Sequence, residues 1–310
     1  MGELTPLSPE VGARIGRLST VSVNRLIEPD VELAGEIRQG AVLPRELLSI
    51  AGLDLDLTPE QLATLSRAEL SSLTEANIRF EAALTAAFMT RIATTMEVTD
   101  VRANYLFHEI GEETRHSRLF IRMLQQLDTP SKNPLHRPFL DRLLLQGMLG
   151  RDVVVDVIVL AGEEMTDFLQ KRASEHPDTD PFVVETARYH RQEEARHVAF
   201  ARMILPVDWA DAKATNRFLV RHAVPLVLAY TFAFLVHPGV YGTVGLPRWG
   251  TWRAVNRTPE WRRLRHASLR PLLDVLLRSG VLKEGRIPRG WRWLVGVDRS
   301  GRPADQPRSA

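Results

Sequence analysis

The chain has 310 residues, of which 44% are hydrophobic and 25% are charged, as in an ordinary globular protein. Its 40 basic and 38 acidic residues give a net charge of +2, so no overall attraction to nucleic acid or to an anionic membrane is expected. The absence of cysteine excludes disulfides, thiolate metal sites and a cysteine nucleophile. A transition metal would have to be bound by histidine and carboxylate side chains, a donor set that suits iron or manganese.

The N-terminal region predicts no targeting segment. Residues 1–30 lack a basic start followed by an apolar run, the pattern of a signal peptide. The longest uncharged apolar run, residues 223–236, contains Pro225 and is shorter than the roughly 20 residues that a membrane span needs. We therefore expect a cytoplasmic protein without a membrane partner, in which this run forms a buried core helix.

The chain is predicted to form one domain, residues 1–310, with three parts. Residues 1–57 are rich in Pro, Gly and Ser, have no sustained hydrophobic period, and predict only a short helix at 44–50. We expect them to form an arm that packs over the core. Residues 58–236 predict a helical bundle, and 237–310 an irregular tail in which only 268–282 is expected to be helical.

Helix start signals place the bundle helices. Thr58, Pro59 and Glu60 combine an N-cap residue, proline at the first helical position and an acid in the first turn. Asp100 marks a second start, and a proline-rich connector is expected at 129–138. The predicted helices cover 58–95, 100–127, 139–174 with a break at 150–151, 181–204 and 208–236.

One motif, Glu-Glu-x-Arg-His, occurs twice, at 112–116 and at 193–197. Residues three apart share a helix face, so the second Glu and the His of each copy point the same way. Another helical glutamate precedes each copy at nearly equal distance, Glu81 and Glu163. These matched spacings predict two similar helical hairpins around a pseudo-twofold axis. Four such helices would offer two lone Glu and two Glu-x-x-His, the ligand set of a ferritin-like dinuclear metal site.

Each ligand has an alternative. A single Glu-x-x-His would favour a solvated helix face, whereas two matched copies with matched upstream glutamates favour metal ligands. Glu163 follows a run that is apolar except for Asp156, where an unpaired carboxylate is costly, and its neighbour Glu164 is the rival position. For Glu81 the rival is Glu75.

His190 stands one helical turn before Glu194, so that His190, Glu194 and His197 form one stripe. A metal ligand and a hydrogen-bonded core histidine are both consistent with this spacing. Glu109 occupies the equivalent place in the first half of the chain.

The first glutamates of the two motifs, Glu112 and Glu193, point away from the predicted metals. We expect them to accept hydrogen bonds from ligand imidazoles on a neighbouring helix, which fixes the tautomer and raises ligand basicity. Arg115 and Arg196 would then balance the buried negative charge, with surface salt bridges as the alternative.

The two motifs, the upstream Glu81 and Glu163, and His190 placed four before Glu194 together resemble the AurF family, the p-aminobenzoate N-oxygenase-like di-iron proteins. The similarity extends from residues 21–51 through the bundle toward Leu282. It implies an all-α fold with a ferritin-like four-helix bundle core, additional helices, an N-terminal arm and an irregular C-terminal tail. Carried over to this sequence, it implies as metal ligands Glu81, Glu113, His116, Glu163, His190, Glu194 and His197.

The resemblance also implies an activity, that of an O2-dependent di-iron monooxygenase. Two iron ions, with manganese as an alternative in one position, would use O2 as co-substrate to oxidise an amine nitrogen, above all that of an aryl amine. Electrons would come from an external donor, because the chain has no flavin or nicotinamide fingerprint. No residue beyond the metal ligands is predicted to be catalytic. The expected partners are a small-molecule substrate, an electron donor and a second copy in a homodimer, but no nucleic acid.

Two alternatives to this activity remain, and a third is disfavoured by the sequence. Phe120 and Ala201 stand where a radical-storing subunit would keep a tyrosine, which argues against radical storage. A di-iron hydroxylase or desaturase acting on carbon is the enzymatic rival, and an iron-storage bundle is the non-enzymatic one. The substrate-binding residues are not identified by sequence; the Arg- and Trp-rich stretch 248–265 offers guanidinium groups that suit a substrate carboxylate.

Overall fold

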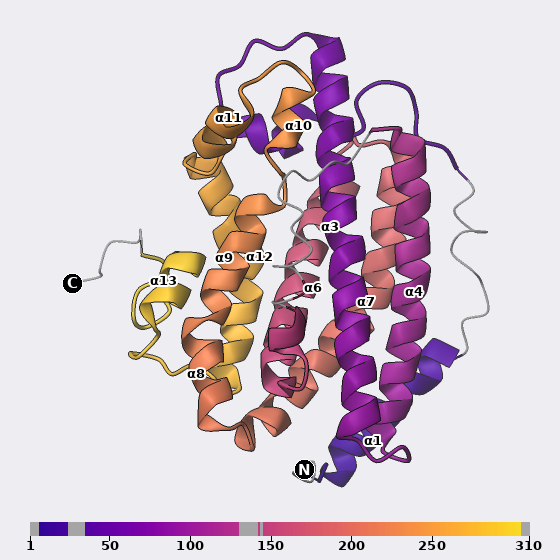
Figure 1. Ribbon diagram of the computed structural model, residues 1–310, viewed down its shortest axis with the longest axis vertical. Helices are drawn as coiled ribbons and strands as arrows, with labels where there is room; N and C mark the ends of the chain where they lie inside the picture. The colour runs from indigo at the N-terminus through magenta and orange to yellow at the C-terminus, as the bar shows by residue number, and fades with distance from the viewer. Residues whose placement is uncertain (1–5, 24–34, 130–141, 143–144, 305–310) are drawn as a thin grey trace.

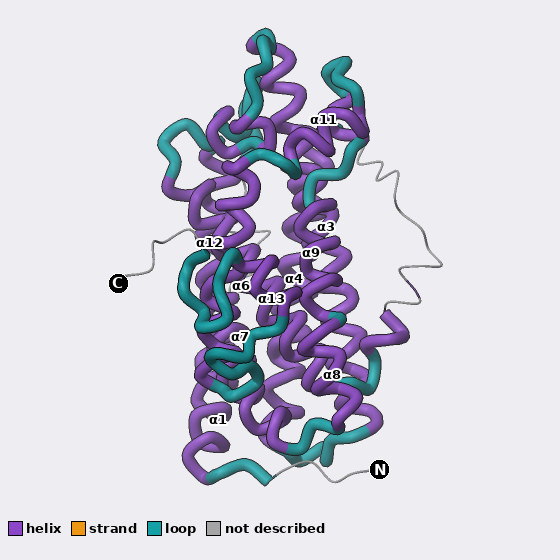
Figure 2. Tube along the Cα trace, turned by 90° about the vertical axis from the view of Figure 1, so that its left-hand side faces the viewer, coloured by secondary structure: helices purple, strands orange, loops and turns teal. Residues whose placement is uncertain are grey.

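The computed structural model describes residues 6–23, 35–129, 142 and 145–304, so most of the predicted connector at 129–138 lies outside it. Within these ranges the backbone is helical, apart from loops and an isolated bridge between Val297 and Pro303. Figures 1 and 2 show four long helices side by side along the molecule. They are α3 (Pro59–Thr94), α4 (Val101–Leu127), α6 (Asp152–Glu175) and α7 (Pro181–Ala210).

Contacts at the helix ends fix the directions of the four helices. Arg67, near the start of α3, donates to the carbonyl of Gln126 at the end of α4 over 2.9 Å. Arg91, near the end of α3, contacts Asp156 at the start of α6 and Asp208 at the end of α7. Helices α3 and α7 therefore run one way and α4 and α6 the other, so the end of α4 and the start of α6 lie at opposite ends of the bundle. The predicted all-α, ferritin-like fold is confirmed.

The predicted helix starts are confirmed. The Thr58 hydroxyl accepts from Gln61 N, and the Gln61 side chain accepts from Thr58 N, which completes a capping box. Asp100 and Asp180 cap α4 and α7 in the same way, with side-chain oxygens that accept backbone N–H groups of the first turn. The predicted break before α6 is present at Gly150, which has a φ of +72°.

The prediction of a mainly irregular arm was wrong at its start. Residues Pro9–Val23 form α1, which packs against α4 and α7. Its apolar residues Val11, Ile15 and Leu18 join a core cluster of the bundle, and Ile15 is fully buried. Packing thus stabilises a helix whose Gly12 and Gly16 give it weak intrinsic propensity. The predicted helix at 44–50 appears as two short 3-10 turns, η1 (Arg45–Leu47) and η2 (Ser49–Gly52).

Helix α7 passes the proline at which we expected it to end. Pro206 lies inside it, and the helix continues to Ala210. Leu205 and Trp209 are buried in a core cluster with α6 and the C-terminal helices, and Asp208 pairs with Arg91. These contacts offset the lost backbone hydrogen bond. The predicted helix at 208–236 is correspondingly divided into α8 (Ala214–His222) and α9 (Val224–Phe234).

The apolar run at 223–236 was predicted to be a buried core helix, but α9 is buried on only part of its surface. Val224, Leu228 and Phe232 are buried, whereas Leu226 and Tyr230 are 64% and 45% exposed. Among the described residues, Ala214–Gly242 is the stretch long and apolar enough to cross a membrane, with 39% of its most apolar window buried. This is weak evidence for a span, since core helices of soluble proteins pass the same test.

The tail holds more helix than predicted. Its helices are α10 (Gly239–Gly242), α11 (Arg248–Val255), α12 (Pro259–Arg278) and α13 (Arg289–Val295). Helix α12 starts nine residues before the predicted 268, where Thr258 caps it by accepting from Trp261 N. The sequence Thr258-Pro259-Glu260 repeats the start signal of α3 and was overlooked. Helix α12 packs on α6 and brings the tail onto the bundle.

A buried glutamate attaches the arm to α3. Glu69 accepts hydrogen bonds from Ser49 N and Ser49 Oγ at 2.8 Å and 2.6 Å, and Ser49 Oγ lies 3.0 Å from the Tyr241 hydroxyl. Burial raises the pKa of Glu69 to about 7, and the bonds from Ser49 oppose that rise.

This raised pKa predicts a pH dependence of stability. The folded state retains the Glu69 proton up to pH 7, whereas the unfolded chain releases it near pH 4.5, so the contribution of Glu69 is lost as pH rises through this window. Glutamine does not titrate, so the drop in unfolding free energy between pH 5 and pH 8 should be about 2 kcal/mol smaller in E69Q than in the parent protein. Urea denaturation at both pH values measures it, with exposed E175Q as control. Equal drops in E69Q and the parent protein would refute the prediction.

Candidate metal centre

The four long helices bring all seven predicted ligands to one interior region. Each of these residues is no more than 3% exposed. Helix α3 contributes one carboxylate, α4 a carboxylate and an imidazole, α6 one carboxylate, and α7 a carboxylate and two imidazoles. The residues are Glu81, Glu113, His116, Glu163, His190, Glu194 and His197.

The two motifs face each other across the α4–α7 interface. His116 Nδ1 lies 3.2 Å from Glu194 Oε1, and His197 Nδ1 lies 3.0 Å from Glu113 Oε1. Within the second motif, His197 Nδ1 lies 2.8 Å from Glu194 Oε2. Each histidine therefore points its Nδ1 at the glutamate of its own motif and at that of the other motif.

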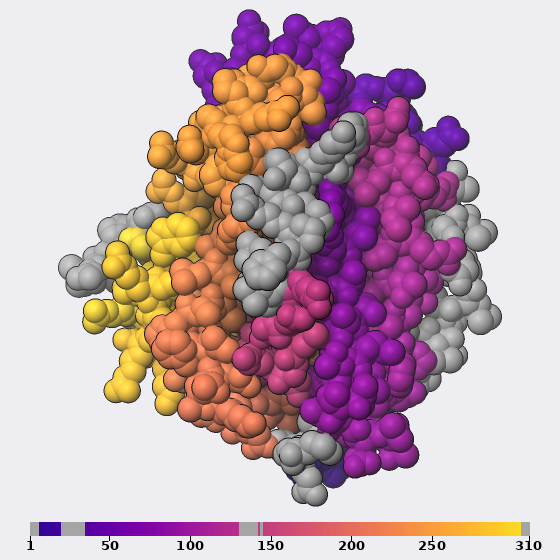
Figure 3. Space-filling view, viewed as in Figure 1, coloured from indigo at the N-terminus to yellow at the C-terminus, as the bar shows by residue number. Residues whose placement is uncertain are grey.

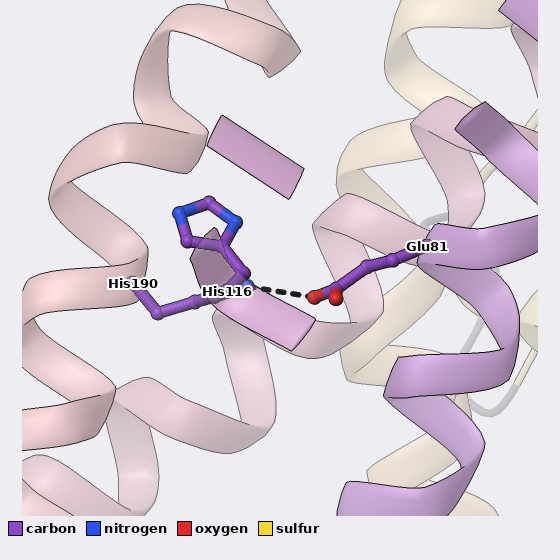
Figure 4. Close-up of side chains that lie close together, drawn as sticks. All are labelled: Glu81, His116 and His190. Carbon is purple, nitrogen blue, oxygen red and sulfur yellow. Dashed lines mark ion pairs between the residues drawn. The ribbon is translucent and has the colours of Figure 1, made fainter. Parts of the chain in front are cut away.

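Glu81 and His190 extend this cluster toward α3 (Figure 4). His190 Nε2 lies 3.5 Å from Glu81 Oε1 and 3.2 Å from Glu194 Oε1, and its ring centroid is 4.4 Å from that of His116. Ser117 donates a 2.6 Å hydrogen bond to Glu81 Oε2. The rival of Glu81, Glu75, instead pairs with the half-exposed Arg79 at 2.8 Å.

Glu163 is the α6 carboxylate that faces the cluster. Burial raises its pKa well above the usual range, and the carboxylates of Glu194 and Glu113 raise it further. Its rival Glu164 forms a salt bridge with the exposed Arg202. The structure thus places Glu81 and Glu163 inside the cluster and both rivals outside it.

The first glutamates of the motifs make the expected contacts with histidines of the opposite motif. Glu193 Oε2 lies 2.9 Å from His116 Nε2, and Glu112 Oε2 lies 3.0 Å from His197 Nε2. Arg196 donates a 2.5 Å hydrogen bond to Glu112 Oε1, and Arg115 lies 3.6 Å from the same oxygen. Both arginines also approach Glu193 Oε1, at 3.6 Å and 3.8 Å. The outer layer is therefore a charge-balanced group of two carboxylates and two guanidinium ions.

This geometry predicts that the outer carboxylates tune the affinity for metal. In E112Q the neutral amide no longer stabilises the N–H of His197 as a carboxylate does. Metal affinity should fall about 10- to 100-fold, the usual cost of losing such a partner. Competition with a chelator measures it, and E75Q, on another bundle helix, is the matched control. Unchanged affinity in E112Q would show that Glu112 does not support the site.

One buried carboxylate was not among the predicted site residues. Glu109 is 1% exposed and lies with Glu113 and His197 in a group whose ligand atoms are all within 4.8 Å of one another. Burial raises its pKa to about 8. The signal was available, because Glu109 precedes Glu113 by the same four residues that separate His190 from Glu194. At this equivalent position the first half of the site therefore has a carboxylate, Glu109, and the second half has an imidazole, His190.

The cluster has the properties of a site for two cations. Several of its atoms lie within ion-pair distance of one another, yet their geometry does not make a hydrogen bond, namely both oxygens of Glu113, His116 Nδ1, His190 Nε2 and Glu194 Oε1. Glu109 Oε2 also has no hydrogen-bond partner among the described residues. Buried polar atoms normally have a partner, so these are available as ligands. Four inner glutamates, if ionised, carry the charge that two divalent ions would neutralise. Oxygen and imidazole donors without thiolates fit iron or manganese.

Electrostatics in the cluster shows how strongly it favours positive charge. Burial opposes the protonation of His116 and His197, yet their pKa values lie well above the usual range because carboxylates surround both imidazoles. The pKa of Glu194 lies well below its usual value; burial opposes this, but His197 and His190 outweigh it. Metal ions would have to displace these protons, so metal binding should release protons.

A mostly apolar cavity of about 100 Å³ borders the cluster on the side of the N-terminal ends of α3 and α7. Two of its lining residues contact His190. The ring centroids of Phe120 and His190 are 5.0 Å apart, and Gln170 Oε1 lies 2.9 Å from His190 Nδ1. Among the described residues that line it, Arg172 is the only charged one, and burial lowers its pKa. None of the lining residues comes from the stretch 248–265, which we considered for substrate binding.

Comparisons with known proteins agree with this architecture. Searches of curated proteins and of solved structures found no match. The model of one protein family, described as p-aminobenzoate N-oxygenase AurF, matches residues 9–280, which include α1, the whole bundle and α12. A match over this much of the chain, together with the helical fold and the buried Glu and His cluster, establishes that the chain belongs to the AurF family.

Proposed function

We propose that the protein is an O2-dependent di-iron monooxygenase that oxidises the amine nitrogen of a small, mainly apolar substrate. The observation that carries this proposal is the enclosed group of four carboxylates and three imidazoles beside an apolar cavity. The ligands would be Glu81, Glu113, His116, Glu163, His190, Glu194 and His197. When bound, the two iron ions would supply the reduction of O2 and the transfer of one oxygen atom to nitrogen.

The chain's own residues supply orientation and enclosure. Glu112 and Glu193 hold the imidazoles of His197 and His116 so that each Nδ1 points inward. Phe120 closes the cavity on the side of His190, and its apolar ring helps exclude water. Electrons would come from a separate donor. We further propose that the protein works in the cytoplasm and that it forms a homodimer.

The cavity limits the substrate to a small molecule. Its volume of about 100 Å³ is of the order of the roughly 150 Å³ cavity known to bind benzene. One aromatic ring with short substituents suits it, which favours an aryl amine. Arg172 would bind an anionic substituent, because guanidinium and carboxylate groups form paired hydrogen bonds.

The proposal is tested with protein loaded with ferrous iron without oxygen, supplied with a reductant and then exposed to ¹⁸O₂. We expect aryl amines to be converted to hydroxylamine, nitroso or nitro products that carry the label on nitrogen, as measured by mass spectrometry. Label on carbon would indicate a hydroxylase instead. Oxidation of many iron ions per chain without an organic product would indicate iron storage. Either result would overturn the proposed reaction.

The role of Arg172 predicts a selective effect. R172M should raise the KM for an amine that carries a carboxylate by about tenfold or more, through loss of a charge-assisted contact, with little change in kcat. The KM for the same amine without the carboxylate should stay unchanged. K171M, at the exposed neighbouring position, is the matched control. Equal effects of R172M on both amines would exclude a carboxylate-binding role.

A further inference from the structure

Positive charge is concentrated in the last third of the chain. After residue 211 the sequence has 18 Arg and Lys against 5 Asp and Glu, whereas residues 1–211 have 22 against 33. The net charge of the whole chain is near zero because a basic C-terminal part and an acidic N-terminal part, which includes the bundle, nearly cancel. Figure 3 shows the segments after residue 211, orange to yellow, gathered on one side of the molecule. Such a field attracts anions to this side.

A cleft between the first half of α12 and α13 collects several of these charges. Its volume is about 580 Å³. Five arginines and one histidine line it, and among its described lining residues there is no acid. The basic residues are Arg257, Arg262, Arg265, His266, Arg289 and Arg292.

The cleft arginines differ from other arginines on the same helix. On α12, Arg263 pairs with Glu260 at 2.6 Å and Arg270 with Asp274 at 3.1 Å. No ion pair is formed by any of the five cleft arginines with the described residues. Arg292 Nε is in addition buried without a hydrogen-bond partner among the described residues, which is rare for a buried polar atom.

Their crowding is electrostatically unfavourable. Burial lowers the pKa of Arg265 to about 10, and the nearby charge of Arg262 lowers it further. Like charges held together in this way are stabilised by an anion that binds several of them at once. Guanidinium groups match phosphate oxygens in geometry and form charge-assisted hydrogen bonds with them.

An aromatic surface stands beside the arginines. Trp293 lines the cleft and is 58% exposed. The guanidinium carbon of Arg265 lies 4.1 Å from its ring centroid, which holds the indole in place by a cation–π contact. The exposed indole offers a planar surface on which an aromatic ring of a ligand can stack.

We propose that this cleft binds a small phosphorylated ligand that also carries a planar ring, with a nucleoside phosphate as the chemical class. The arginines would bind the phosphates and Trp293 would stack with the ring. The cleft volume lies within the roughly 300–1,000 Å³ of small-molecule sites. Its concave shape favours such a ligand over a nucleic acid strand, which needs an extended groove. The site lies outside the bundle and is independent of the proposed oxidation.

Calorimetric titration of the whole protein with ATP at 0.15 M salt tests the proposal, with tripolyphosphate and adenosine as partial ligands. We expect one ATP per chain. The double substitution R262Q/R289Q, at two exposed positions, should weaken ATP binding at least about tenfold. W293A should weaken binding of ATP roughly fivefold or more but leave tripolyphosphate unaffected, because only the stacking contact is lost.

R286Q/R299Q is the control, since it removes the same charge from the same basic region at exposed positions outside the cleft, and it should change ATP affinity less than about twofold. Thermal unfolding checks that all variants fold. The proposal is overturned if ATP does not bind at millimolar concentration, or if the control pair loses as much affinity as the cleft pair. Binding of a single-stranded oligonucleotide but not of ATP would also overturn it and would identify the surface as one for nucleic acid.

Discussion

Substitution of His197 by alanine is expected to remove most of the metal from the protein. His197 Nδ1 lies within 3.0 Å of both Glu113 and Glu194, so its loss takes one donor from the centre of the cluster. The loss of affinity should exceed the roughly 10- to 100-fold expected for the outer carboxylates. Metal per chain, measured by mass spectrometry after equilibrium with a chelator, should fall clearly below that of the parent protein.

The control for this experiment is H222A, which removes an exposed histidine outside the bundle and should retain the full metal content. Circular dichroism is needed for both variants, because H197A leaves the carboxylate of Glu112 without its imidazole partner. A folded H197A protein with normal metal content would show that His197 is not a ligand.

Substitution of Arg91 by leucine is expected to cause the largest loss of stability. Arg91 is 5% exposed and lies among Asp152, Asp156 and Asp208, which belong to the ends of α6 and α7. Removing it leaves buried carboxylates without a counter-charge, which typically costs about 3–5 kcal/mol. Denaturant unfolding at pH 7 measures the change. R79L removes an arginine from the same helix that is paired at the surface, and should cost less than about 1 kcal/mol.

The effect of R91L should diminish in acid. Burial and the neighbouring Asp208 hold the pKa of Asp156 well above its usual value, so this carboxyl takes up a proton readily once pH falls. Adding D156N to R91L should restore part of the lost stability at pH 7, because one buried charge is then removed. If R91L lowers the free energy of unfolding no more than R79L does, the ion pairs of Arg91 with the aspartates of α6 and α7 contribute little to stability.

The sequence predicted what depends on local signals and on a repeated motif. The helix starts predicted at Thr58, Asp100 and Pro181 need only nearby residues for their caps, and these predictions were confirmed. The motif predicted that Glu112 and Glu193 contact imidazoles on a neighbouring helix, and the structure shows that these belong to the other copy of the motif. The ligand role of the cluster itself stays a prediction until metal is measured.

The sequence could not predict what depends on packing between distant segments. Helix α1 forms around Ile15, whose burial against the bundle is not visible in its own glycine-containing sequence. Helix α7 continues past Pro206 because Leu205 and Trp209 pack into the core with later helices. The cavity and Arg172 depend on how the arm covers the bundle, so no spacing in the chain identifies them.

The reciprocal pairing of α4 and α7 has a consequence for assembly. Each Glu-Glu-x-Arg-His segment supplies ligand candidates and also the carboxylate that orients the histidine of the other segment. In either hairpin alone the motif histidine, His116 or His197, lacks the glutamate that orients it, so a fragment with only α3 and α4 should bind metal weakly. Iron uptake would therefore report the docking of the two hairpins, and a mutation that separates them would empty the centre without touching a ligand.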